Sequence, residues 1–280
     1  MKKELLYLAS LCVLLLGQFS TKAQDFAKEF VALQSDTATS ETIYVGFADR
    51  IMHTNTTINS MPGFDELDST TQAQLRAKYT LVLDKVHDSI LLSEFKAEFL
   101  STLAALGFKV VECNPNEFPS RLETGEHTLS IAQLELEEYM SNDSLTSDRY
   151  GQHIVCNKLL NGLRWNTWLL FDQADSTSRQ MFFADDKTTD DLFGYIERDN
   201  GQYYANYQIT KINPNDAYLL ARSNAEICGR YLFNFLMNKY VWLKTEGNPT
   251  YYYSIDHNGT LLYDNQAFDN FDIIPLVTSV

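Results

Sequence analysis

Residues 91–112, LLSEFKAEFLSTLAALGFKVVE, join a helical pattern directly to a strand pattern. Apolar side chains recur there at helical spacing, at Leu92, Phe95, Phe99, Leu103 and Leu106. Gly107 follows at the position where many helices end in a left-handed residue. The run Phe108–Glu112 is short, apolar and β-branched, as in a strand. The stretch therefore predicts a helix that ends near residue 106 and a strand that begins at once.

A second strand is predicted before this helix, at Thr42–Phe47, where β-branched and aromatic residues gather. Two strands joined through a helix are expected to be parallel, with a right-handed crossover. Between them, residues 48–68 are predicted to form a polar loop with a turn at Pro62-Gly63. A helix capped by Ser69 or Thr70 is expected to run toward Val86, although alternation over residues 79–83 also allows a strand.

The chain after residue 127 is rich in strand patterns. Residues 127–140 alternate between apolar and polar side chains, and residues 141–150 are interpreted as a polar connector. Further strands are predicted at 154–160, 163–172, 181–184, 193–198, 202–212, 251–255 and 260–263. Three Asn-Gly pairs, at residues 161–162, 200–201 and 258–259, predict hairpin turns because both residues tolerate positive φ.

The longest predicted helix begins at Pro214, with Asn213 as its cap. Its core stripe consists of Ala217, Ala221, Ala225, Cys228, Leu232 and Leu236. The predicted fold is α/β: a mixed β-sheet with at least two packed helices and a strand-rich C-terminal half with β-hairpins. We expect a single domain over residues 42–280, and any boundary within it falls near 141–150.

The N-terminus has the three parts of a signal peptide: Lys2-Lys3, an apolar run over residues 5–16, and small residues before Gln24. Cleavage is expected after Ala23, which leaves residues 24–41 as a polar lead-in. A lipoprotein signal at Cys12 is the alternative, but Leu11 precedes it where a small residue would be expected. We therefore expect an exported protein, periplasmic or extracellular, without a membrane-spanning segment after cleavage; outer-membrane attachment is the less favoured outcome.

The composition restricts the partners. The chain has 22 basic and 37 acidic residues, for a formal net charge of −15. Nucleic acids and anionic membranes need a basic surface, so neither is an expected partner. Besides Cys12 the chain has three cysteines, at positions 113, 156 and 228, which can form at most one disulfide and show no metal-binding spacing.

No catalytic or cofactor motif is found. The sequence lacks a Gly-x-Ser-x-Gly elbow, a phosphate-binding glycine loop and a His-Glu-x-x-His pair. His153 and Cys156 are three apart, so on a strand they point to opposite faces. The densest acidic cluster could offer oxygens to calcium, but a solvated acidic loop is the simpler interpretation; its members are Asp185, Asp186, Asp190 and Asp191.

Aromatic side chains are the more suggestive feature. Exposed Tyr and Trp stripes on strands often mark recognition surfaces, although cross-strand packing explains many of them. The candidate recognition aromatics are Trp165, Trp168, Tyr203 and Tyr252.

The order of predicted elements resembles the small periplasmic α/β domains of envelope accessory proteins, namely the N-terminal domain of TolB and the lipoproteins related to CsgG and LpoB. The resemblance covers element order over residues 42–240, and it implies protein–protein contact in the envelope without catalysis. The leading hypothesis is thus a non-catalytic exported envelope protein that binds another protein or cell-wall material. The alternative is a secreted hydrolase that acts on glycans or peptides through carboxylates.

Overall fold

The computed structural model describes residues 22–280, except residues 60, 149–150, 175–178, 248–250, 265–271 and 276–280. Cys12 and nearly all of the predicted signal peptide lie outside the described residues. The strands are β1 (Thr42–Gly46), β2 (Ile51–Asn55), β3 (Lys109–Glu112), β4 (Glu126–Ser147), β5 (Ile154–Gln173), β6 (Gln180–Thr189), β7 (Asp191–Asp199), β8 (Gln202–Thr210), β9 (Tyr252–Ile255), β10 (Leu261–Asp264) and β11 (Asp272–Pro275). The helices are α2 (Thr56–Asn59), α3 (Ser69–Tyr79), α4 (Asp88–Ala105) and α5 (Pro214–Lys244), with short 3-10 helices at Phe64–Glu66, Leu83–Lys85 and Pro115–Glu117.

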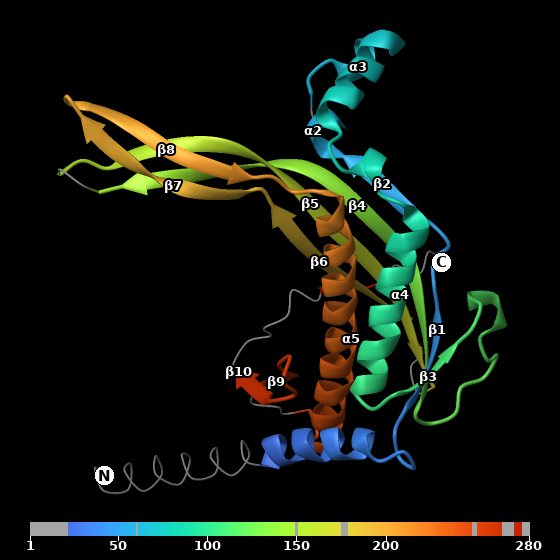
Figure 1. Ribbon diagram of the computed structural model, residues 1–280. Coiled ribbons are helices and arrows are strands. Elements are labelled where there is room, and N and C mark those ends of the chain that lie inside the picture. Colours follow the sequence, from blue (N-terminus) through green and yellow to red (C-terminus); the bar gives the residue numbers. More distant parts are fainter. Residues whose placement is uncertain are drawn as a thin grey trace, which may run out of the picture.

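The main sheet is mixed and has the order β11-β6-β5-β4-β1-β3. β1 is parallel to both β3 and β4, whereas β4, β5, β6 and β11 pair antiparallel. β2 also pairs with β4, beyond the end of β1. The short strands β1 and β2 thus lie one after the other along the same edge of the long strand β4. Figure 1 shows α4 and α5 side by side over one face of this sheet. The predicted fold class is confirmed.

The strand–helix–strand unit predicted around residues 91–112 is present as β1, α4 and β3. Phe95, Phe99 and Leu103 of α4 are fully buried, and Gly107 has a φ of 92° after the helix. A side chain at Gly107 would also collide with the Gln34 carbonyl oxygen, 2.3 Å from the Cβ position. Phe95 stacks on Trp165 of β5 with ring centroids 5.8 Å apart, which joins the helix to the centre of the sheet.

α5 begins as predicted. The Asn213 side chain accepts from the Asn215 backbone N–H, and Asp216 completes a capping box with Asn213. All six residues of the predicted stripe are buried: Ala217, Ala221, Ala225, Cys228, Leu232 and Leu236. Small side chains let the helix lie close to its neighbours, and Gly229 is so close to Thr102 of α4 that an added Cβ would lie 2.7 Å from its methyl group.

Two predictions about β4 and β5 are wrong. Residues 141–147 continue β4 rather than forming a connector, and Asn161-Gly162 lies inside β5 rather than in a turn. The two strands pair continuously from His127↔Gln173 to Ser147↔Ile154, with one bulge that leaves Ala132 exposed. Gly162 is required by packing, because a Cβ there would lie 2.4 Å from the Tyr139 ring.

The far ends of β4 and β5 leave the body as an arm, and the β7–β8 hairpin lies along them (Figure 1). We use "the arm" for residues 139–147 and 154–162 together with β7 and β8. Its buried apolar side chains Leu145, Leu160 and Ile196 are separate from the main core cluster. The Asn200-Gly201 turn is confirmed, with φ of 51° and 81° as a two-residue hairpin requires.

The N-terminal third differs most from prediction. Residues 22–35, the last two of the predicted signal peptide and the first part of the expected polar lead-in, are helical, with Ala27 and Phe30 buried against the body. The expected loop at 48–68 contains β2, α2 and a 3-10 helix. α3 is capped by Asp68, not by Ser69 or Thr70, and it ends at Tyr79 without a buried side chain.

The C-terminal hairpin of β9 and β10 is confirmed, with Gly259 at a φ of 76° in its turn. Two amides of α5 hold β9: Asn234 Oδ1 accepts from Ile255 N–H, and Asn238 bonds both the N–H and the carbonyl of Tyr253. Within the described ranges, no helix combines the length and apolar character needed to cross a bilayer.

Candidate interaction surface

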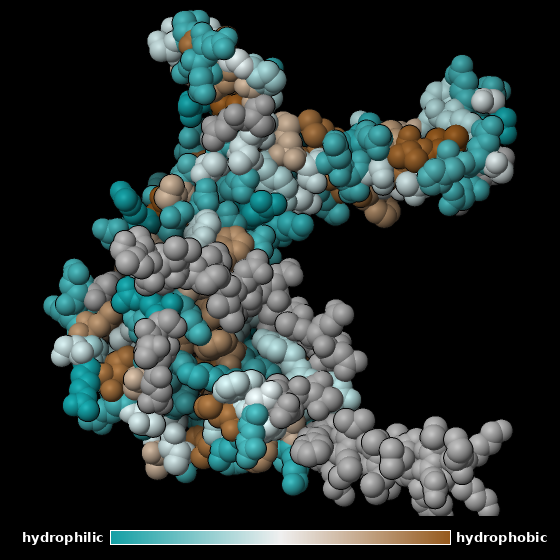
Figure 2. All heavy atoms as spheres, turned by 180° about the vertical axis from the view of Figure 1, so that it is seen from behind, coloured by the Kyte–Doolittle hydropathy of each residue, from teal (hydrophilic) through white to brown (hydrophobic). Residues whose placement is uncertain are grey.

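The β7–β8 hairpin has two different faces, because successive strand residues point to opposite sides. Its inner face turns toward β4 and β5 and includes buried Ile196 with half-buried Leu192 and Ile209. Its outer face presents Phe193, Tyr195 and Tyr204, which are 76%, 51% and 49% exposed. We call these three residues the outer aromatic patch. Hydrophobic and hydrophilic side chains lie side by side near the end of the arm in Figure 2.

Hydrogen bonds fix the tyrosines of the patch while their rings stay exposed. The Tyr195 hydroxyl accepts from Asn206 Nδ2 at 3.1 Å, and its hydrogen bond to Glu197 raises the pKa of Tyr195. The Tyr204 hydroxyl donates to Gln202 Oε1 at 2.6 Å. Aromatic rings that are already oriented lose little conformational entropy on binding, which suits them to contact a partner.

The inner face of the hairpin is held to β5 and to the segment just before it. Lys158 Nζ lies 3.8 Å from the centroid of the Tyr207 ring, and the Tyr203 hydroxyl donates to Gln152 at 2.8 Å. On the remaining face of the arm, β5 exposes Val155 and Leu159, at 46% and 58%. Apolar side chains are therefore exposed on both outer surfaces of a thin, two-layered arm.

Asp190 fixes the base of the arm. This residue lies between β6 and β7 and is only 3% exposed. Its carboxylate accepts from the backbone N–H and side-chain amide of Asn161 on β5, at 3.0 and 2.7 Å, and from Ile212 N–H at 2.9 Å. Its own N–H donates to the Asn161 carbonyl. One carboxylate thus joins β5, the start of β7 and the segment before α5.

The other acidic candidates are dispersed. Asp185 and Asp186 lie on β6 and point to opposite faces; Asp185 is 3.8 Å from Arg164 Nε, and Asp186 accepts from Lys187 N–H. Asp191 begins β7 and is exposed. The predicted acidic loop is thus wrong, since these residues belong to two strands. In the described part of the chain, no three His, Cys, Asp or Glu side chains are grouped so as to hold a metal.

The four candidate recognition aromatics do not form one surface. Trp165 is fully buried in the core, and Trp168 is half-buried against Phe183, with ring centroids 5.0 Å apart. Tyr203 is half-buried on the arm, and half-buried Tyr252 lies in the distant β9. One feature of the sequence could have predicted the outer aromatic patch. The Asn200-Gly201 turn sets the register that brings Phe193, Tyr195 and Tyr204 to one face.

All three cysteines of the described residues are free thiols. Burial raises the pKa of the Cys228 thiol to about 12, so this residue is an inert part of the core. His153 bonds Asp148 at 2.6 Å at the exposed tip of the arm. His153 is therefore paired with a carboxylate and precedes β5, whereas Cys156 lies within β5.

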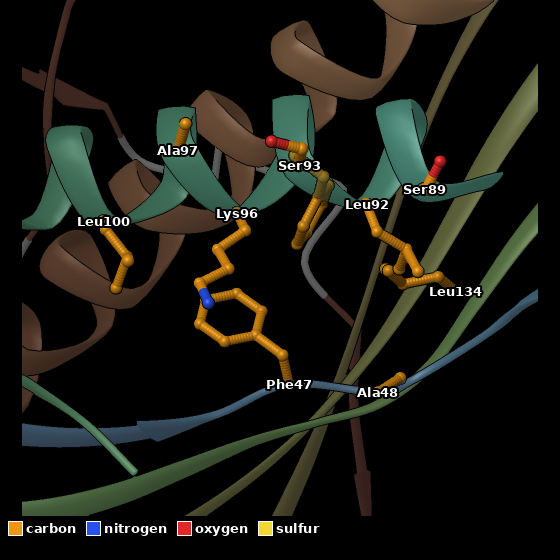
Figure 3. A pocket seen from close by; sticks show the side chains of 10 residues that line it. Phe47, Ala48, Ser89, Leu92, Ser93, Lys96, Ala97, Leu100 and Leu134 are labelled. Atoms are coloured by element: carbon orange, nitrogen blue, oxygen red, sulfur yellow. The ribbon is translucent and has the colours of Figure 1, made fainter. Parts of the chain in front are cut away.

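The α4 hollow is a depression of about 430 Å³ between α4 and the carboxyl end of β1. Figure 3 shows Lys96 extending from α4 over Phe47, and Leu92 beside Leu134. The Lys96 ammonium is 2.5 Å from Glu112 and 5.6 Å from the Phe47 centroid, so it already has partners. The polar groups in the lining are Lys96 and two serine hydroxyls, without a carboxylate or histidine among them.

Carboxylates on the sheet are paired with protein groups. Glu137 lies 3.4 Å from Arg164, and Glu135 accepts from Thr54 and from Asn166. Buried Glu138 accepts from the backbone N–H groups of Leu81 and Val82, and burial raises its pKa. These contacts hold β2 and residues 80–83 against β4. Glu138 does not line the α4 hollow.

No protein-family model and no curated protein matches the chain.

Proposed function

We propose that this is a non-catalytic binding protein, exported to the cell envelope, that contacts another protein through the outer aromatic patch of its arm. The single observation that carries the proposal is the exposure of Phe193, Tyr195 and Tyr204 on an arm that extends from the body. A phenylalanine that is three-quarters exposed contributes little to the stability of a monomer, because little of its apolar surface is removed from water. A partner that covered it would gain about 1.5–3 kcal/mol for that side chain alone.

The form of the arm supports a protein partner. The patch lies on one face of the hairpin, where the polar residues Asn206, Gln208 and Glu197 are cross-strand neighbours of the three aromatic residues. Protein interfaces also combine exposed aromatic anchors with neighbouring hydrogen-bonding groups. Fixed tyrosine hydroxyls would orient the partner. Small-molecule sites are instead concave, and none of the three patch residues lines the α4 hollow.

The contacts of the carboxylates on the main sheet support binding over hydrolysis there. A carboxylate that acts as an acid or base needs to face a substrate. Glu138, whose pKa is raised, instead faces the backbone of residues 81 and 82. Glu137 and Asp185 lie on either side of Arg164 as structural ion pairs. Export rests on the signal-peptide pattern of residues 1–23 and on the acidic composition.

The proposal is tested by affinity capture from intact cells that secrete a tagged chain. The double variant Phe193→Ser, Tyr204→Ser removes the patch, and Val155→Ser, Leu159→Ser is the matched control on the opposite face. We expect a discrete protein partner to be captured by wild type and control but reduced at least tenfold by the patch variant. Equal capture by all three would overturn the proposal.

Cell-wall material is the other partner class, and a parallel experiment separates it. The purified chain is sedimented with isolated wall fragments. Sedimentation that disappears with the patch variant would show that the patch binds wall polymer, and the proposed protein partner would then be wrong.

A further inference from the structure

β8 is an edge strand without the usual protection. It pairs with β7 on one side, and no described strand pairs with it on the other. Its sequence, QYYANYQIT, contains no charged residue, proline or glycine. Edge strands are normally protected against pairing by charges, prolines or bulges. Other strands of this protein do carry charges: β7 has Asp191, Glu197, Arg198 and Asp199, and the edge strand β3 has Lys109 and Glu112.

The register shows which backbone groups of β8 face outward. The two-residue turn makes Asp199↔Gln202 the first hydrogen-bonded pair, and hydrogen-bonded pairs then alternate along the ladder. The N–H and carbonyl groups of Tyr203, Ala205, Tyr207 and Ile209 therefore point away from β7. They offer a regular row of donors and acceptors over nine residues, without a bulge.

We propose that β8 pairs antiparallel with β8 of a second copy of this chain, about a two-fold axis at Asn206. In this register the outward-facing residues meet as Tyr203 with Ile209 and Ala205 with Tyr207 of the second copy. In both pairs, each residue donates its backbone N–H to the carbonyl oxygen of the other residue. In the second pair the small Ala205 lies opposite the large Tyr207, and Asn206 faces its own counterpart.

The absence of charged residues from β8 permits a second copy as the occupant. With a net charge of −15, two copies repel each other over most of their surfaces. The β8 edge is a place where they can meet without placing like charges opposite each other. The arm also separates the bodies: antiparallel pairing sets the tip of each arm beside the base of the other, with the bodies at opposite ends.

The paired hairpins would form one four-stranded sheet whose outer face carries both outer aromatic patches. This inference does not depend on the proposed function, although a dimer would present two patches to a partner. Pairing through one strand edge buries less surface than a standard interface, so we expect weak, concentration-dependent association.

Sedimentation equilibrium of the purified chain tests the pairing. Asn206→Lys places two ammonium groups, and Asn206→Asp two carboxylates, on the two-fold axis. We expect each variant to raise the dimer dissociation constant roughly tenfold or more, because like charges face each other. An equimolar mixture of the two should restore dimerisation as a Lys–Asp heterodimer.

The matched controls are Asn157→Lys and Asn157→Asp, which change charge equally on the exposed opposite layer of the arm. They should leave the dissociation constant within about twofold of wild type, and thermal melting should show that every variant is folded. A wild type that stays monomeric at all accessible concentrations would overturn the proposal. A mixture that associates no better than either Asn206 variant alone would also overturn it.

Discussion

Replacing Asp190 by alanine should destabilise the protein more than any other single carboxylate removal at the arm. The change deletes the acceptor for three donors, two of which are backbone N–H groups, at Asn161 and Ile212. A buried donor left without an acceptor costs roughly 1–3 kcal/mol. The side-chain amide of Asn161 can turn toward water, and removing a buried charge offsets part of the loss. We therefore expect a net loss of about 3 kcal/mol.

For a chain of this size, 1 kcal/mol corresponds to roughly 2–4 °C in melting temperature, so the expected shift is about 6–12 °C. Thermal melting followed by circular dichroism measures it. The control is Asp191→Ala, which removes the neighbouring exposed carboxylate and should cost less than about 0.5 kcal/mol. Hydrogen exchange adds a local measurement, since the Ile212 amide should lose protection only in the Asp190 variant. Equal melting shifts for the two variants would refute this explanation of how the arm is fixed.

Three further predictions concern Glu138, Gly162 and the cysteines. Because burial raises the Glu138 pKa above its ordinary value of 4.5, the folded chain holds a proton that the unfolded chain has lost, and stability falls as pH rises through this window. Glu138→Gln should remove that decline in urea unfolding at pH 4–7; an unchanged pH slope would contradict it. Gly162→Ala should destabilise the folded protein by about 1–3 kcal/mol, because the added methyl group overpacks against the Tyr139 ring. Adding Tyr139→Ala to this variant should recover part of the loss. A Gly162→Ala variant as stable as wild type would show that the ring is not packed there. Iodoacetamide should alkylate Cys113 and Cys156 in the native chain but Cys228 only after unfolding, as measured by mass spectrometry. Alkylation of Cys228 in the native chain would contradict its assignment to the inert core.

The parts of the fold that were predicted correctly have local causes. α4 and α5 each combine an apolar stripe with a terminal signal, Gly107 in one case and Asn213-Pro214 in the other. The two confirmed hairpins are set by their Asn-Gly turns, in which a few adjacent residues determine the backbone. Such features need no knowledge of distant contacts.

The parts that were predicted wrongly depend on contacts between distant residues. β2 forms by pairing with β4 about 80 residues later, and its short sequence has no pattern of its own. Residues 141–147 are polar because they belong to a thin arm with little core, so their composition resembles a loop. Gly162 looks like a turn residue, but the Tyr139 ring is the reason that it is a glycine.

The candidate site could be predicted only in part. Trp165 was one of the four candidate recognition aromatics, but the core between α4 and the sheet buries it completely. Phe193 and Tyr195 share the outer face with Tyr204 only because of the hairpin register, which follows from the turn at Asn200. The role of Asp190 could not be foreseen, since its partners lie 29 and 22 residues away along the chain.

Site-specific photo-crosslinking in intact cells tests most directly whether the arm is the binding surface. A photoreactive phenylalanine analogue is placed at Phe193 in one variant and at exposed Asn157, on the opposite layer, in another. A discrete protein adduct from position 193, with none from position 157, is the predicted result. Adducts from position 157 alone, or from neither position while the folded chain is present in the envelope, would contradict the account.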